Sequence, residues 1–139
     1  MSDSNVKQAV PFFGVSDMEG SLRYYVDGLG FEMKNKWVVD DKIRWCWLEL
    51  GEVVVMLQEF FRDEKHDYRP EGKLGQGVSI CFVCEDAIRF FREVTSRNIE
   101  AGRPFVGNGM WVTSLTDPDG YRLEFESYTD VPEDTVFEE

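Results

Sequence analysis

Apolar residues recur along this chain with two different periods, and each period predicts a kind of element. A spacing of three to four residues places side chains on one face of a helix. It occurs at Met18, Leu22, Tyr25 and Leu29, and again at Ala87, Phe90, Phe91 and Val94. We expect the first of these helices to begin with a capping box, in which Ser16 and Glu19 satisfy free backbone N–H groups. The pattern therefore predicts two amphipathic helices.

Segments of alternating apolar and polar residues predict strands, because successive side chains of a strand point to opposite faces of a sheet. One such segment precedes each predicted helix and three follow it. Their ranges are 8–15, 31–39, 42–50 and 52–61 in the first half, and 78–84, 102–107, 110–116 and 121–127 in the second. A tight turn is predicted at 117–120, and the charged, glycine-rich residues 62–77 are expected to form an exposed, mobile connection.

The two halves repeat one pattern. Three segments of the first half have counterparts in the second half, 66 to 69 positions further on. These segments are Val-Ser-Asp-Met, Leu-Arg-Tyr-Tyr and Gly-Phe-Glu. A repeat of this length is too small to be an independent domain, so the two must pack together.

We predict an α+β fold, a single domain over 1–139, made of two tandem βαβββ modules at about 8–61 and 78–128. Their sheets should form an open, cup-shaped, eight-stranded sheet with the helices outside. The cup is the natural ligand site. The acidic tail, 129–139, is expected to be frayed.

The charge of the chain excludes some partners. Its net charge is −12, from 27 acidic and 15 basic residues, and a field of that sign repels phosphate backbones, so no nucleic-acid partner is expected. The acidity has two interpretations: it keeps the surface solvated, or it attracts a cationic ligand. No apolar run reaches the ~20 residues of a membrane span, so no membrane partner is expected. The first residues, MSDSNVKQ, show no signal pattern, and we expect a cytoplasmic protein.

The three cysteines suit a reducing compartment. Cys81 and Cys84 have the spacing of a metal-binding pair, but residues three apart on a strand point to opposite faces. We therefore predict that these two are buried small hydrophobic residues. The single histidine, His66, falls in the connection, and no serine or cysteine has a recognisable partner for nucleophilic catalysis.

The duplicated pattern, with VSDMEGSLRYYVDGLGFE at one end and TDPDGYRLEFES at the other, resembles the vicinal oxygen chelate superfamily. Its members include glyoxalase I, extradiol dioxygenases, fosfomycin-resistance enzymes and bleomycin-resistance proteins. The resemblance covers residues 8–128 and implies the fold. It does not imply one particular activity, because this fold hosts many activities.

The resemblance also implies four metal positions, one on the first and one on the last strand of each module, usually His or Glu. In this chain they fall on Val10, Met56, Ser79 and Glu124, and a shift of two at position 56 would offer Gln58. Only Glu124 is a competent ligand for a divalent ion, because valine and methionine cannot bind it usefully and serine is a poor donor. We therefore expect no metal and no cofactor.

Alternation and the resemblance together predict which residues line the cup. Glu124 either pairs with Arg122 or binds a ligand amine or acts as a base. Trp45 and Trp47 share one face of their strand, and Trp111 follows a flexible glycine-containing loop. The tryptophans either pack in the core or a dimer interface, or form an aromatic wall for a ligand. The predicted ligand-binding residues are Phe12, Trp45, Trp47, Met56, Gln58, Ser79, Trp111, Arg122 and Glu124.

In these features the chain looks like the bleomycin-resistance branch, whose members are homodimers that sequester a large cationic drug in acidic, aromatic-lined clefts. The resemblance implies a homodimeric, metal-independent small-molecule-binding protein for a cationic or aromatic compound such as a bleomycin-type antibiotic. One alternative is a metal-dependent lyase, isomerase or dioxygenase with a non-standard site that uses Glu124. Another is a dimeric scaffold or interaction module.

Overall fold

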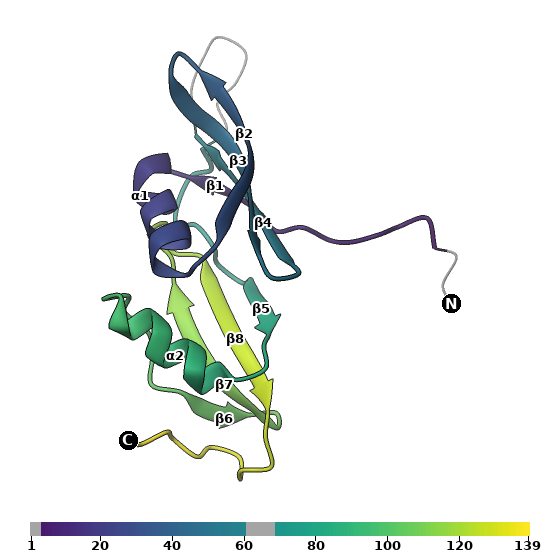
Figure 1. Cartoon of the computed structure of the whole chain (residues 1–139), viewed down its shortest axis with the longest axis vertical. Coiled ribbons are helices and arrows are strands. Elements are labelled where there is room, and N and C mark those ends of the chain that lie inside the picture. Colours follow the sequence, from purple (N-terminus) through teal and green to yellow (C-terminus); the bar gives the residue numbers. More distant parts are fainter. Residues whose placement is uncertain (1–3, 61–68) are drawn as a thin grey trace.

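The computed structural model describes residues 4–60 and 69–139, and within them eight strands form two four-stranded sheets. The sheets have the strand orders β1-β4-β3-β2 and β5-β8-β7-β6. The helices of both modules lie on one side of the sheets, which leaves the opposite faces uncovered (Figure 1). This arrangement confirms the predicted α+β fold of two tandem βαβββ modules, and the sheet is not closed.

The elements follow the predicted order. The first module holds β1 (Phe12–Val15), α1 (Met18–Leu22), the π-helical turn η1 (Arg23–Gly28), β2 (Glu32–Val39), β3 (Lys42–Leu50) and β4 (Val53–Glu59). The second holds β5 (Ser79–Val83), α2 (Ala87–Ser96), β6 (Phe105–Gly107), β7 (Met110–Thr116) and β8 (Arg122–Tyr128). In each module the first strand pairs in parallel with the last, and the other pairs are antiparallel.

The first strand begins later than predicted. Residues 8–11 lie outside β1, although the Pro11 carbonyl still accepts a hydrogen bond of 2.9 Å from the Met56 N–H. Proline has no N–H to donate and restricts its predecessor, so the ladder starts only after it. Gln8, Ala9 and Pro11 still line a hollow together with residues of β4 and β5. The described residues before them extend away on the uncovered side of the sheets (Figure 1).

The predicted capping box is absent from the first helix. Its N-cap is Asp17, and no side chain of the helix start caps it. The Ser16 N–H instead donates to the carboxylate of Asp119, and the Met18 N–H donates to Glu59 Oε2 at 2.9 Å. Partners distant in the sequence thus satisfy the N–H groups that a local pair was expected to satisfy.

The two modules share a core at their junction. The rings of Phe13 and Tyr121 stack with centroids 4.5 Å apart, and Tyr25 and Leu29 of the first helical segment are buried as predicted. Tyr25 Oη donates to Asp117 Oδ2 at 2.7 Å, and Tyr121 Oη donates to the Gly14 carbonyl at 2.8 Å. The modules therefore pack on each other as the length of the repeat requires.

The C-terminal tail is ordered, so the prediction that it is frayed was wrong. The Val106 N–H donates to the Thr135 carbonyl at 2.9 Å, and Val136 forms an isolated bridge with Phe105. The ring of Phe137 packs edge-on against Trp111. The tail thus lies beside β6 as an extra extended segment. Among the described residues no helix is long and apolar enough to cross a membrane.

Candidate functional site

The uncovered face of the first sheet, here the first open face, gathers five of the predicted ligand-binding residues. Met56 lies between Phe12 and Trp47 in the sheet, and Gln58 lies between Gly14 and Trp45. Neighbours in register share a face. The residues of β4 between them, Val55 and Leu57, are fully buried on the helix side, so the predicted alternation is confirmed.

The register of the β2–β3 hairpin adds a third tryptophan to the first open face. Trp37 lies opposite Trp45 and is 51% exposed. The indole N–H of Trp47 donates to Glu49 Oε2 at 2.7 Å, which fixes that ring on the sheet. Trp37 was not among the predicted site residues. Its place opposite Trp45 across the Asp40–Asp41 turn was the signal that could have found it.

A hollow of about 370 Å³ lies at one end of the first open face, lined by Phe12, Gly14, Gln58, Glu59 and Phe60. Phe60 follows the last strand and was missed at the sequence level. A Cβ atom on Gly14 would stand 2.3 Å from the Phe60 ring, so only glycine lets this ring lie against the strand. The guanidinium of Arg69 lies 5.4 Å from the centre of the same ring, close enough for a cation–π contact.

The uncovered face of the second sheet, here the second open face, holds three more predicted residues. Ser79 lies opposite Arg122, and Cys81 lies opposite Glu124. Arg122 and Glu124 form an ion pair of 3.4 Å, as one of the two interpretations of Glu124 required. Because the Arg122 side chain is 57% exposed, this pair contributes little to stability.

Cys81 lies between two carboxylates on the second open face. Its Sγ donates to Glu124 Oε2 at 3.7 Å, and the ligand atoms of Cys81, Glu124 and Glu126 all lie within 4.8 Å of one another. Desolvation, with the charges of Glu126 and Glu124, raises the pKa of the Cys81 thiol to about 11. The prediction that Cys81 is a buried hydrophobic residue was wrong, because its side chain is exposed.

The four positions that the resemblance implies for a metal do not fit a divalent ion. Val10 precedes β1, Met56 stands on the first open face, and Ser79 is opposite Arg122 rather than Glu124. Glu124 is the one good donor among them. The group of Cys81, Glu124 and Glu126 comes from β5 and β8 alone, so it is not a site shared by the two modules.

Trp111 is not brought together with the other predicted residues. It lies opposite Ser127 and Val106, both buried on the helix side of the second sheet. Its ring meets Phe137 edge-on with centroids 6.1 Å apart. The register of β7 therefore directs it to the tail. His66 lies outside the described residues.

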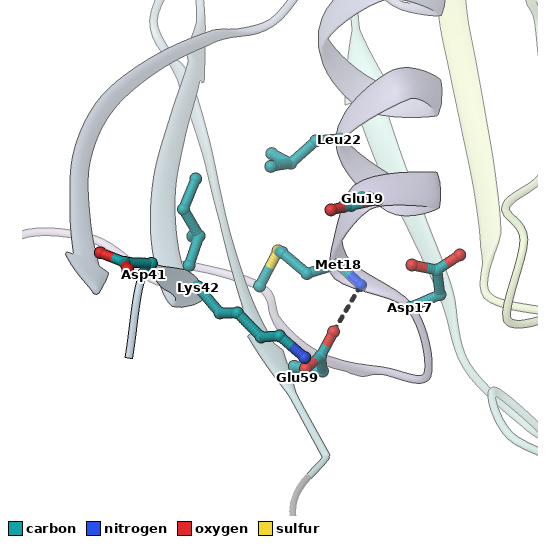
Figure 2. A pocket seen from close by; sticks show the side chains of 8 residues that line it. Asp17, Met18, Glu19, Leu22, Asp41, Lys42 and Glu59 are labelled. Carbon is teal, nitrogen blue, oxygen red and sulfur yellow. Dashed lines mark hydrogen bonds between the residues drawn. The ribbon is translucent and has the colours of Figure 1, made fainter. Parts of the chain in front are cut away.

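Another hollow, of about 380 Å³, lies on the helix side between α1 and the β2–β3 hairpin (Figure 2). Four carboxylates and one lysine surround an apolar floor there; the lining residues are Asp17, Met18, Glu19, Leu22, Asp41, Lys42, Ile43 and Glu59. Both oxygens of Glu59 are engaged, one by the Met18 N–H and the other by Arg44. No predicted ligand-binding residue lines this hollow.

Comparison with known proteins defines the class of this chain. The family model described as Glyoxalase/Bleomycin resistance protein/Dioxygenase superfamily matches residues 8–125. The chain belongs to this superfamily, which confirms the resemblance drawn from its two end motifs. No curated protein matches the chain.

Solved structures share the fold at low sequence identity. A bleomycin-binding protein complexed with bleomycin is 21% identical with a TM-score of 0.66, and the match covers 89% of this chain and 100% of that one. TnmS3, an antibiotic binding protein from Streptomyces sp. CB03234, is 16% identical with a TM-score of 0.69, covering 91% and 99%. TioX from Micromonospora sp. ML1 is 17% identical with a TM-score of 0.68, covering 89% and 100%.

Proposed function

We propose that this chain is a metal-independent protein of the cytoplasm that, as a homodimer, binds and sequesters a cationic or aromatic small molecule such as a bleomycin-type antibiotic. The observation that carries the proposal is the first open face, where Phe12, Trp45, Trp47, Met56 and Gln58 gather beside the hollow of about 370 Å³. The fold is shared with a bleomycin-binding protein and an antibiotic binding protein, which supports this class of ligand.

In this proposal the aromatic residues of the first open face stack on the ligand. Trp45 and Trp47 offer two large rings side by side, and aromatic faces attract both planar rings and cations. Met56, which lies between Phe12 and Trp47 in the sheet, adapts its shape, and Gln58 donates or accepts one hydrogen bond. Phe12, which is 54% exposed, adds apolar surface at the edge.

The second open face supplies the charge that a cationic ligand requires. Glu124 and Glu126 stand on the same side of β8, and the whole chain carries a net charge of −12. Carboxylates that face a ligand ammonium or guanidinium form charge-assisted hydrogen bonds, which are among the stronger polar contacts. Ser79 and Arg122 on the same face contribute further polar contacts.

The test is a titration of the protein with bleomycin in the presence of a chelator, followed by tryptophan fluorescence and calorimetry. We expect saturable binding without added metal. Trp45→Leu and Trp47→Leu should each weaken it by about tenfold, the effect of losing one stacking partner. Trp111→Leu is the matched control, because Trp111 lies on the helix side, and it should leave the affinity unchanged. Absence of binding across bleomycin and other cationic aromatic compounds would overturn the proposal.

One observation favours a second candidate, a metal-dependent lyase, isomerase or dioxygenase that uses Glu124. The ligand atoms of Cys81, Glu124 and Glu126 lie within 4.8 Å of one another, as the donors of one metal ion do. Elemental analysis of protein purified without chelator decides between the candidates. A stoichiometric divalent ion that Glu124→Ala removes and Glu52→Ala, an exposed control, retains would replace the metal-independent function with the enzyme.

A further inference from the structure

One hollow of the second module has a charge opposite to that of the whole protein. It measures about 230 Å³ and lies where β7 ends and β8 begins. Its lining contains two cationic side chains, those of Lys73 and Arg122, and no acidic one among the described residues. The lining residues are Lys73, Leu74, Gly75, Gln76, Gly77, Thr116, Gly120 and Arg122. In a chain with a net charge of −12, such a site is a local exception that an anion would recognise.

The backbone of residues 74–77 is shaped to donate hydrogen bonds to an anion. Gly75 and Gly77 both have a φ of +77°, whereas the φ of Leu74 and of Gln76 is not positive. The sign of φ thus alternates along four residues, the pattern in which successive N–H groups converge into a concave anion-binding nest. No hydrogen bond between described residues uses the N–H of Gly75, Gln76 or Gly77.

This loop is held against the neighbouring turn. A Cβ atom on Gly75 would stand 2.8 Å from the Gly120 carbonyl oxygen and 3.1 Å from the Tyr121 Cα. Gly120, with a φ of +101°, belongs to the turn before β8. The absence of a side chain at Gly75 allows this approach, and the positive φ of Gly120 favours glycine there. The N–H groups of the loop are therefore held beside the start of β8.

The side chains around the loop add charge and a hydroxyl. Thr116 lies opposite Arg122 in the sheet, so both side chains stand on the second open face. Arg122 makes one long ion pair of 3.4 Å with Glu124, which leaves most of its five N–H donors available. Lys73 forms no ion pair with any described residue.

We propose that this hollow is an oxyanion-binding subsite, which takes a phosphate, sulfate or carboxylate group through Lys73, Arg122, the Thr116 hydroxyl and the N–H groups of residues 75–77. The proposal goes beyond the sequestration of an aromatic or cationic compound, because it does not involve the first open face. Arg122 is common to the subsite and to the second open face, so a ligand with both charges could reach the two at once.

The test is a titration of the whole chain with sodium phosphate at constant ionic strength, followed by two-dimensional amide NMR. We expect saturable shifts of the Gly75 and Gly77 amide signals, with a dissociation constant on the order of 1 mM. Lys73→Gln and Arg122→Gln should each weaken binding by about fivefold, the effect of one exposed ion contact. The matched control is Lys36→Gln on β2, which removes the same charge far from the hollow and should change the affinity less than about twofold.

Parallel titrations with sulfate and acetate identify the group: tighter binding of phosphate and sulfate indicates a tetrahedral oxyanion, and tighter binding of acetate indicates a carboxylate. Thermal unfolding verifies that each variant is folded. Amide shifts that do not saturate would show general charge attraction and overturn the subsite. So would a loss of affinity in Lys36→Gln equal to the losses in Lys73→Gln and Arg122→Gln. Because bleomycin is absent from this experiment, its result is independent of the ligand titration.

Discussion

At the scale of single residues, the thiol of Cys81 is controlled by its surroundings on the second open face. Desolvation, Glu126 and Glu124 together raise its pKa from 9.0 to about 11. The thiol is therefore protonated near neutral pH and donates its hydrogen to Glu124. An exposed cysteine would ordinarily be reactive, but only the thiolate is a nucleophile. Cys81 is therefore protected by its raised pKa, to which desolvation contributes most and the charges of Glu126 and Glu124 add.

We expect iodoacetamide to alkylate Cys81 slowly at pH 8 and much faster as the pH approaches 11. At pH 8 the thiolate fraction is on the order of a hundredfold lower than for a thiol with a pKa of 9. Glu126→Gln should move the midpoint of the pH profile downward, because it removes a negative charge that opposes ionisation. Glu93→Gln on α2 is the control. Mass spectrometry follows Cys81 separately, and a midpoint near 9 would contradict the expectation.

How far single site residues could be predicted depended on the register of their strands. Met56 and Gln58 were assigned to the open side because the alternation of β4 is regular and Val55 and Leu57 are apolar. Trp111 is different, since polar Ser127 faces the helix side beside it and gives no apolar signal. Cys81 was predicted to be buried because the residues around it are apolar. Its position opposite Glu124 in a parallel strand pair is not visible in the sequence.

At the scale of elements, the C-terminal segment completes the second module. Glu133 accepts hydrogen bonds from the Asn108 and Gly109 N–H groups, and the Phe137 N–H donates to Pro104. The Arg92 guanidinium lies 5.3 Å from the centre of the Phe137 ring. The segment thus covers the free edge of β6, where unpaired backbone groups would otherwise invite pairing with another chain.

Loss of the Phe137 ring should destabilise the fold. The ring contacts Phe91, Trp111 and Arg92, and we expect Phe137→Ala to lower the free energy of unfolding by about 1–3 kcal/mol. Val136 is 52% exposed, so Val136→Ala should cost less than about 0.5 kcal/mol. Urea unfolding measures both values. Equal effects of the two substitutions would show that the ring does not anchor the tail.

Elements with a regular apolar period were predicted well, and those defined by distant partners were not. Both helices and all eight strands were placed in order, because their stripes and alternation are continuous. The tail has few apolar residues, and many of its partners lie more than twenty residues earlier in the chain, as in the Thr135–Val106 contact. The start of the first helix is similar, since Asp119 and Glu59 replaced the expected local cap.

At the scale of the whole molecule, the uncovered faces leave large apolar side chains in water. Phe12 is 54%, Trp37 51% and Val83 62% exposed. Apolar surface of this kind on one side of two sheets is typical of an interaction site. The predicted homodimer would cover part of it, and β1 and β5, each at the edge of its sheet, offer further pairing surface.

Light scattering at micromolar concentration should therefore give twice the mass of one chain. We expect the dimer because it would bury the exposed apolar residues of the open faces, and stable dimers bury a large area of apolar surface. Trp37→Lys should shift the mass toward that of a single chain, while the control Val6→Lys in the segment before β1 should not. A single-chain mass for the unchanged protein would contradict the homodimer.

The hydrogen bonds at the junction make the two modules depend on each other. Each half satisfies polar groups of the other: Tyr25 with Asp117, Tyr121 with Gly14, and Arg97 with the Gly28 carbonyl. Separating the halves would remove the partners of Asp117, Tyr25 and Tyr121, and it would expose to water the apolar side chains that pack across the junction, such as Phe13. The two modules depend on each other for these contacts, so we expect the chain to melt in one cooperative step.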